Sequence, residues 1–289
     1  MKLWGRFTGD IDAWHHPPEP VLTRTFLDRA ELTLGGRRIE LLATPGGEAA
    51  DALVVWLPDA GLVFVGNLLG PMFGHVPNLY TIRGDKIRSA LTFVHSVDRV
   101  LDLAPATLVN GHDVFRGAEE IRTTLTKVRD ATLYLRDRTI DGMNAGTDVW
   151  TLMGRIALPA ELALPQMHGK VPWIVRAIWE EHAGWFRYES TTELYDVPPS
   201  AVWPDLLELA GGPAALTDRA RSQLAAGRAL HALHLTDIVL RDRPTDPAAL
   251  DVRRGALERL LAASGRENFS EVQWLESEIA ETEAPTEAP

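Results

Sequence analysis

The sequence predicts an α/β protein in which a β-sheet region comes first and a helical region follows. Apolar runs separated by glycine-bearing turns indicate strands within the first 112 residues. From Arg116 onward the apolar residues instead recur at the spacing of α-helices almost throughout. With 289 residues, 45% of them hydrophobic, the chain is long enough for one large domain or two smaller ones.

Two consecutive β-hairpins are predicted at the start of the sheet. Residues 31–44 carry alternating apolar side chains around Gly35-Gly36, which supplies a two-residue turn. Residues 53–65 form the second hairpin around a Pro-Asp-Ala-Gly turn. The near-continuous apolar character of this second hairpin predicts strands that are covered on both faces.

Helices and one more strand follow these hairpins. Residues 85–103 have helical spacing, with Asp85 as the candidate N-cap, and residues 107–109 resemble a short buried strand that leads to His112. Later helices are expected at 117–144, 149–157, 173–182, 201–209, 214–226, 229–241 and 247–263.

Composition excludes several classes of protein. Without cysteine the chain can form neither disulfides nor thiolate metal sites. The net charge of -11 is concentrated at the C-terminal end, because residues 267–289 hold seven Glu and no Lys or Arg, and such a distribution does not favour nucleic-acid binding. No segment approaches the ~20 apolar residues of a membrane span, so we expect a cytoplasmic protein.

Three polar side chains stand where predicted strands end in glycine-bearing turns. They are Glu48 after Pro-Gly-Gly, Asn67 after Phe-Val-Gly, and His112 after Asn-Gly. Ligands of α/β proteins commonly bind at such positions, and oxygen and nitrogen donors brought together there can hold a metal. For His112 taken alone, a histidine that caps a turn is an equally good interpretation.

These turns and several later motifs resemble the alkylsulfatases of the metallo-β-lactamase superfamily, which hydrolyse long-chain alkyl sulfates. The resemblance extends from Gly5 to Ile279, with the motifs in family order. Besides the three turns it rests on Tyr80-Thr81-Ile82-Arg83-Gly84, Arg129-Asp130-Ala131, Asp137-Arg138-Thr139, Met143-Asn144-Ala145-Gly146, Leu158-Pro159, Trp173-Ile174-Val175-Arg176, Gly184-Trp185-Phe186, Asn268-Phe269 and Trp274-Leu275.

The resemblance implies a domain organisation. Residues 21–128 would form the second half of a metallo-β-lactamase αββα sandwich, preceded by an irregular arm at 1–20. An all-α alkylsulfatase-type dimerisation domain would follow at 129–281, and a disordered tail at 282–289.

The resemblance also implies a metal site, of which this chain holds one part. In the family, a His-x-His-x-Asp-His motif and three later ligands hold two zinc ions that bridge a hydroxide. The later ligand positions correspond to Glu48, Asn67 and His112, but the motif is absent and position 67, normally acidic, is an amide. Since a zinc site needs three or four protein ligands, we expect zinc only in complex with a partner chain that carries the motif, or none in this chain alone.

The family uses Asn and Arg from the corresponding segment to hold the sulfate. Here these are Asn78 and Arg83, an amide and a guanidinium fork that suit a tetrahedral oxyanion. The alternative role of Arg83 is a salt bridge to the neighbouring helix. For Tyr80, packing in the protein and contact with the substrate are equally good interpretations. His75 can approach the same site.

We therefore predict a subunit of a split enzyme that displaces sulfate from an alkyl sulfate ester. A homologous chain would supply the other half of the metallo-β-lactamase fold, in a heterodimer or a dimer of heterodimers. The nucleophile would be water or, as in natural-product relatives, a substrate amine that closes an aziridine. Two alternatives stay open: a non-catalytic assembly or scaffold subunit with a degenerate metal site, and a chain from which an upstream segment has been lost.

Overall fold

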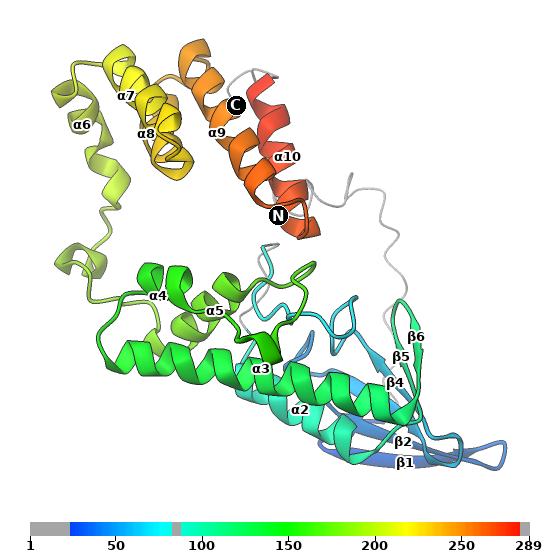
Figure 1. Ribbon diagram of the computed structural model, residues 1–289. Helices are drawn as coiled ribbons and strands as arrows, with labels where there is room; N and C mark the ends of the chain where they lie inside the picture. The colour runs from blue at the N-terminus through cyan, green and yellow to red at the C-terminus, as the bar shows by residue number, and fades with distance from the viewer. Residues whose placement is uncertain (1–23, 83–87, 284–289) are drawn as a thin grey trace. The chain divides into compact units, whose positions relative to one another are not determined.

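The computed structural model describes residues 24–82 and 88–283 (Figure 1). By its internal contacts the chain divides into two compact units, Met1–Gly184 and Trp185–Pro289. Among the described helices, none is both long and apolar enough to cross a lipid bilayer.

The first unit contains a six-stranded sheet whose strands lie side by side in chain order. All neighbours are antiparallel except β4 and β5, which are parallel. The strands are β1 (Arg29–Leu34), β2 (Arg37–Ala43), β3 (Leu53–Leu57), β4 (Leu62–Gly66), β5 (Thr107–Asn110) and β6 (Val114–Arg116). Both predicted hairpins are confirmed, whereas β6 was not predicted.

The first hairpin turn shows why glycine is required there. Gly35 and Gly36 have φ angles of 58° and 76°. Two consecutive left-handed residues are the geometry of a turn whose twist matches that of the flanking strands, and only glycine adopts it without strain.

The α-helices among the described residues of the first unit are α2 (Ala90–Asp102), α3 (Ala118–Asn144), α4 (Val149–Arg155) and α5 (Val171–Ala183). The predicted start of α2 was wrong. Ser89 is its N-cap, with an extended backbone and an Oγ that accepts a hydrogen bond from Thr92 N at 3.4 Å. Asp85, the cap expected from the sequence, lies outside the described residues.

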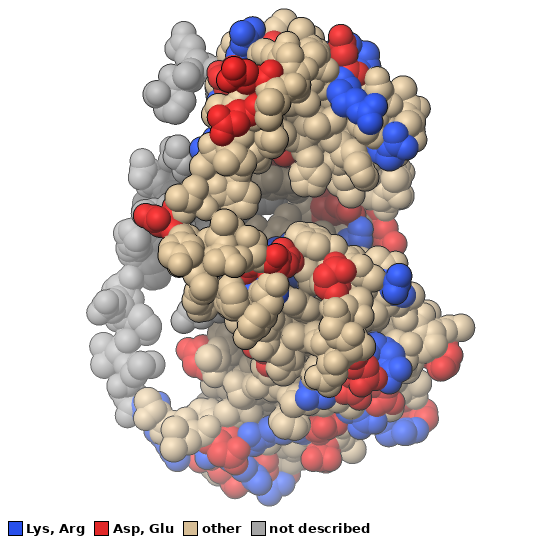
Figure 2. All heavy atoms as spheres, turned by 90° about the vertical axis from the view of Figure 1, so that its left-hand side faces the viewer, with Lys and Arg blue, Asp and Glu red and all other residues tan. Residues whose placement is uncertain are grey.

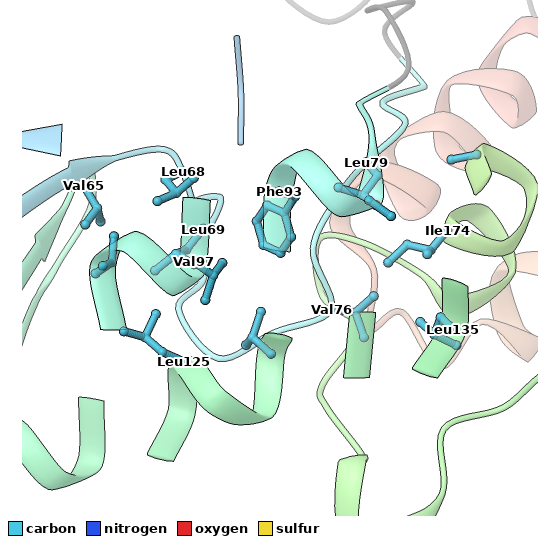
Figure 3. Close-up of a cluster of buried hydrophobic side chains, with 14 of the residues drawn as sticks. Val65, Leu68, Leu69, Val76, Leu79, Phe93, Val97, Leu125, Leu135 and Ile174 are labelled. Atoms are coloured by element: carbon cyan, nitrogen blue, oxygen red, sulfur yellow. The ribbon is translucent and has the colours of Figure 1, made fainter. Parts of the chain in front are cut away.

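One face of the sheet packs against these helices and forms the core. Trp56, Val63 and Leu108 occupy neighbouring positions on this face, and each is at most 8% exposed. The buried cluster continues through Phe93 and Val97 of α2 into the inner side of α3 (Figure 3). Their burial removes the largest block of apolar surface in this unit from water.

The other face was predicted to be covered as well, and among the described residues this is wrong. We call this second face the open face. Its side chains are mostly half-buried or exposed, and none belongs to the core cluster. Phe64 and Val114, for example, are 40% and 41% exposed. The open face comprises Ala30, Leu32, Leu34, Arg37, Ile39, Leu41, Ala43, Leu53, Val55, Leu57, Leu62, Phe64, Thr107, Val109, Val114 and Arg116.

The second unit is helical, as predicted. Its α-helices are α6 (Trp203–Leu209), α7 (Pro213–Ala225), α8 (Ala229–Asp242), α9 (Pro247–Ala263) and α10 (Phe269–Glu283). Short 3₁₀ helices lie at Thr191–Leu194 and Pro199–Val202 in this unit, and at Pro58–Ala60 and Ala160–Leu162 in the first unit. Small alanines between α7, α8 and α9 allow close packing; Ala220, Ala232 and Ala256 are fully buried.

Helix α10 was not predicted, and it corrects the proposed tail. Thr282 and Glu283, assigned to a disordered tail, belong to this helix, while 284–289 lie outside the described residues. An ion-pair network fixes α10 on its neighbours, since Arg253 binds Asp237 at 2.5 Å and Glu278 at 2.9 Å. Burial lowers the pKa of Arg253, but these two carboxylates raise it by more, so its pKa lies above the usual value and the charge is retained.

The division by contacts falls after Gly184 rather than after Val128. Helices α3 and α5 share the core of the sheet unit through residues such as Leu135 and Ile174 (Figure 3). The boundary at 128 stays a prediction about domain organisation.

Candidate active site

The parallel pair β4 and β5 brings two of the predicted residues into adjacent turns. Gly66 pairs with Asn110, and Gly111 N donates a hydrogen bond to Gly66 O at 3.1 Å. Asn67 and His112 directly follow these strand ends. A Cβ atom on Gly111 would lie 2.8 Å from Asn67 Oδ1, so the glycine is what lets the two turns approach.

Asn110 shapes the turn that presents His112. Its Oδ1 accepts hydrogen bonds from the backbone N of His112 at 2.9 Å and of Asp113 at 2.6 Å. Asparagine commonly closes turns in this way. Because Asn110 closes the turn, the His112 side chain is left exposed at the end of β5.

The turn that carries Glu48 lies against the same region. A Cβ atom on Gly47 would come within 2.7 Å of Leu68 Cα, directly after Asn67. On its other side this turn rests on α2, where Ser96 Oγ donates a hydrogen bond to Pro45 O at 2.6 Å. The three strand-end turns are thus contiguous, although they are separated by up to 64 positions in the chain.

Asn78 lies in a loop that is held by the core on both sides. Val76 and Leu79 are 1% exposed and point into the cluster around Phe93 and Ile174 (Figure 3). The backbone of this loop also touches Gly169, where a Cβ atom would lie 2.3 Å from Pro77 O. The Asn78 side chain is therefore fixed, with 9% of its surface exposed.

Arg88, which the sequence did not single out, connects this loop to the Glu48 turn. Its Nε donates a hydrogen bond to Glu48 O at 3.0 Å, and its Nη1 donates one to Asn78 O at 2.7 Å. A guanidinium has donors in a rigid fork, so one side chain can set the spacing of two backbone segments. In the sequence, Arg88 is only a basic residue directly before the N-cap of α2. Nothing in that pattern indicates that its side chain joins two loops.

Replacing Arg88 with methionine is expected to loosen both segments and to cost about 1–2 kcal/mol of the free energy of unfolding, because two charge-assisted hydrogen bonds are lost. Urea unfolding and amide hydrogen exchange at residues 46–49 and 78–80 measure this. Arg254→Met is the control, since Arg254 pairs with the exposed Asp251 at 2.6 Å within α9 of the second unit, and such pairs contribute at most about 1 kcal/mol. Unchanged exchange at both segments would contradict the role of Arg88.

The remaining predicted residues do not all join this group. Tyr80 is 39% exposed, two residues after Asn78. His75 instead lines a groove of about 490 Å³ with Arg116 and Lys127, and none of the other predicted residues lines that groove. Arg83 lies outside the described residues.

Three buried oxygens near the turns lack a hydrogen-bond partner among the described residues: Thr44 Oγ1, Asn67 Oδ1 and Asn78 Oδ1. Such atoms are costly to leave unsatisfied and often mark sites that act on another group. For metal, however, the donor set is too small. Within 24–82 and 88–283, no three His, Asp or Glu side chains are grouped so as to hold an ion.

Glu48, Asn67 and His112 therefore do not make up a zinc site on their own. A carboxylate and an imidazole are strong ligands, but the third group is a neutral amide.

Charged side chains on the face shown in Figure 2 are of both signs, without a basic surface of the kind that binds nucleic acid.

Comparison with known proteins identifies relatives. Residues 152–282 match the sequence model of the family described as "Alkyl sulfatase dimerisation". The chain is 30% identical over 254 residues to a linear primary-alkylsulfatase of Pseudomonas sp., covering 86% of this chain and 47% of the relative. It is 24% identical over 237 residues to an (R)-specific secondary-alkylsulfatase of Pseudomonas sp., covering 79% of this chain and 35% of the relative.

A solved structure has the same fold. The stereoselective inverting sec-alkylsulfatase of Pseudomonas sp. superposes with a TM-score of 0.80 at 21% identity, over 91% of this chain and 42% of that chain. The chain thus spans less than half the length of the relatives it matches. The expected fold class and the resemblance to alkylsulfatases are confirmed.

Proposed function

Because the chain is related to alkylsulfatases over most of its length, we propose that it supplies one part of a shared active site that cleaves an alkyl sulfate ester. The observation that carries this proposal is the convergence of the Glu48, Asn67 and His112 turns beside the Asn78 loop. On this proposal a second polypeptide provides the remaining metal ligands in a His-x-His-x-Asp-His motif.

Sulfate binding is assigned to Asn78 and Arg83. The Asn78 amide is buried next to the Glu48 turn, and a guanidinium five residues later adds charge that complements a sulfate monoester. Together they would hold the ester while its alkyl C–O bond breaks. The bonding electrons leave with the sulfate, and the nucleophile forms the new bond to carbon and then loses a proton.

The nucleophile distinguishes two outcomes. Attack by water gives an alcohol, whereas attack by a neighbouring amine of the substrate gives an aziridine, as in natural-product biosynthesis. An amide at position 67 suits a site that no longer needs a bridging hydroxide, which favours the amine. Product analysis with a 2-amino alkyl sulfate separates the two, since one route yields a cyclic amine and the other an amino alcohol.

Zinc is proposed as the cofactor only for the assembled site. This chain would contribute Glu48 and His112 to it, with Asn67 at a degenerate ligand position. The assembly would be a heterodimer, or a dimer of heterodimers if the matched dimerisation region associates with a second copy.

A second candidate function is that of a scaffold subunit without catalysis. The incomplete ligand set among the described residues favours it, together with the match to a dimerisation family over 152–282. The scaffold would retain the fold of an enzyme while its site is silent.

Co-purification with a motif-bearing chain of the same source tests the proposal. We expect a stable complex that contains zinc and releases sulfate, and a chain that binds no such partner and no zinc would contradict it. In that complex Arg83→Ala should lower turnover by about 10²–10³-fold, as expected when a charge-stabilising donor is removed. Arg122→Ala is the control, because Arg122 is largely exposed and pairs with Glu119 at 2.6 Å on the surface of α3.

A further inference from the structure

A groove of about 490 Å³ lies in the first unit, between strand β6 and helix α3. The first half of α3 forms one side of it, and the loops at 73–75 and 163–165 form the rest of the lining with β6. A volume in this range is typical of pockets that hold a small organic molecule. The residues of the candidate active site at 48, 67, 78 and 112 do not line the groove, so that site does not account for it.

The walls of the groove are held in place by the fold. Val76 N donates a hydrogen bond to Pro165 O at 2.9 Å, which joins the two loops. A Cβ atom on Gly74 would lie 2.9 Å from Thr124 Cγ2, so the 73–75 loop rests directly on α3. The groove is therefore formed before any ligand binds, and binding does not carry the cost of ordering a loop.

One part of the groove is aromatic. Phe73 comes from the loop and Phe115 from β6, and their ring centroids are 4.6 Å apart with the ring planes tilted by 50°. Both rings pack against the core of the first unit, and Ile121, which also lines the groove, is 1% exposed. An apolar group placed here would leave water and gain contact with these side chains.

Two cations, Arg116 and Lys127, also line the groove. Within residues 24–82 and 88–283, neither of them forms an ion pair, and Lys127 is half-buried. The arginines of α3 differ in this respect, because each pairs with a carboxylate: Arg122, Arg129, Arg136 and Arg138. Cations that have no carboxylate of their own in a concave site favour the binding of an anion.

One carboxylate, that of Glu120, lines the same groove. It lies seven positions before Lys127, about two helical turns away. A Cβ atom on Gly117 would lie 4.0 Å from Glu120 Oε2, so this carboxylate is turned toward the first turn of α3, where the helix dipole stabilises a negative charge. Two cations and one anion leave a single positive charge, which matches a singly charged acid.

We infer that the groove binds a small organic anion, of the class of a medium-chain carboxylate. Its acidic group lies at Arg116 and Lys127, and its apolar body lies on Phe73 and Phe115. This inference does not rest on the proposed function, because it involves neither zinc, nor a sulfate ester, nor a second chain.

Calorimetric titration of the full chain with octanoate tests the site. We expect one octanoate to bind per chain. Octanamide has the same apolar body without the charge, and acetate has the charge without the body, so each is expected to bind at least about tenfold more weakly. Equal affinities for octanoate and octanamide would overturn the inference, as would no binding of octanoate up to about 10 mM.

A change of charge tests the acidic end. Lys127→Gln is expected to weaken octanoate binding by about tenfold, since a charged hydrogen-bond donor is lost. Arg122→Gln is the matched control, because it removes the same charge from the same helix and Arg122 does not line the groove. Equal affinities for the two variants would mean that octanoate does not contact Lys127.

Added bulk tests the location. Ala163 is exposed and lines the groove, so Ala163→Trp is expected to obstruct it and to weaken octanoate binding by about tenfold or more. Ala160→Trp is the control, since Ala160 is also exposed, three positions earlier, and does not line the groove. Equal affinities would contradict the assignment of the groove.

Arg83→Gln separates the groove from the segment to which sulfate binding is assigned. It should leave octanoate binding unchanged. If Arg83→Gln abolishes the binding while Lys127→Gln retains it, the anion binds at the candidate active site and the inference about the groove fails, with the proposed function still standing.

Discussion

Replacing Gly47 with alanine is expected to disrupt the contact between the Glu48 turn and the Asn67 turn. We expect a loss of about 1–3 kcal/mol in the free energy of unfolding, the usual cost of forcing extra atoms into a packed site. In the proposed complex with a motif-bearing chain, the same change should abolish zinc binding, because the ligand turns would move apart.

The physical reason is that rotating the Leu68 side chain, whose Cδ1 is nearest to the added methyl group at 2.6 Å, would not relieve the contact, because backbone atoms of Leu68 are almost as close. The methyl group would lie 2.7 Å from Leu68 Cα and 2.9 Å from Leu68 O, which are backbone atoms. Leu68 is itself 3% exposed and packs with Phe93 in the core (Figure 3), so it cannot retreat without disturbing α2. The strain therefore falls on the turn.

Urea unfolding measures the loss, and hydrogen exchange at residues 46–49 locates it. Gly154→Ala is the matched control, because nothing lies within 4 Å of the added methyl group in α4. There alanine should stabilise the helix, by at most about 1 kcal/mol. Equal stability of Gly47→Ala and the natural protein would show that the two turns are not in obligatory contact.

Much of the sheet was predictable because its signals are local. The two glycines at 35 and 36 determine the first turn, and the apolar runs on either side of it set the register. The strand before His112 was predicted for the same reason. Strand β6 was not predicted because its three residues are too few to produce a periodic pattern.

What failed depended on distant contacts. An apolar strand has the same sequence whether its second face is covered by its own chain or left open, so Val55 and Phe64 gave the wrong expectation for the described residues. Helix α10 is rich in glutamate, and its place depends on Arg253, 25 positions before Glu278. Only Thr282 and Glu283, the last two residues of α10, had been assigned to the tail, since the sequence beyond them is rich in Ala, Pro, Thr and Glu.

The candidate site shows the same division. Each of Glu48, Asn67 and His112 could be found from its turn, since a strand followed by glycine is a local pattern. Arg88 could not, because its partners Glu48 and Asn78 lie 40 and 10 residues away and are contacted through backbone oxygens. Backbone acceptors leave no trace in the identity of the residue that provides them.

Replacing Asn67 with aspartate is expected to make stability depend on pH. Asn67 Oδ1 is buried and has no partner among the described residues, so a carboxylate there would be desolvated. Its folded-state pKa would rise above the unfolded value of about 3.9. The variant should therefore match the natural protein below both pKa values and lose stability as the pH rises between them. The loss is about 1.4 kcal/mol for every tenfold difference between the folded and unfolded acid dissociation constants.

Urea unfolding at about pH 4 and about pH 7.5, in the presence of a chelator, measures this difference. Asn268→Asp is the control, because Asn268 is more deeply buried than Asn67, at 1% exposure, but its Oδ1 accepts a hydrogen bond from Glu271 N at 3.0 Å. A carboxylate at that helix start is favoured, so no loss with rising pH is expected. If the free energy of unfolding of Asn67→Asp does not change with pH, the side chain at position 67 is solvated.

The same variant tests the role of this position in the shared site. On the proposed function, the new carboxylate would be a zinc ligand in the complex with the motif-bearing chain, and the metal would offset its desolvation cost. Zinc should then stabilise the Asn67→Asp complex more than the natural one, and tighten metal binding by about 10-fold or more, given that losing even an outer-shell partner costs about 10–100-fold. If Asn67→Asp gains nothing from zinc, position 67 does not face the metal, and the His112 and Glu48 turns would have to complete the site without it.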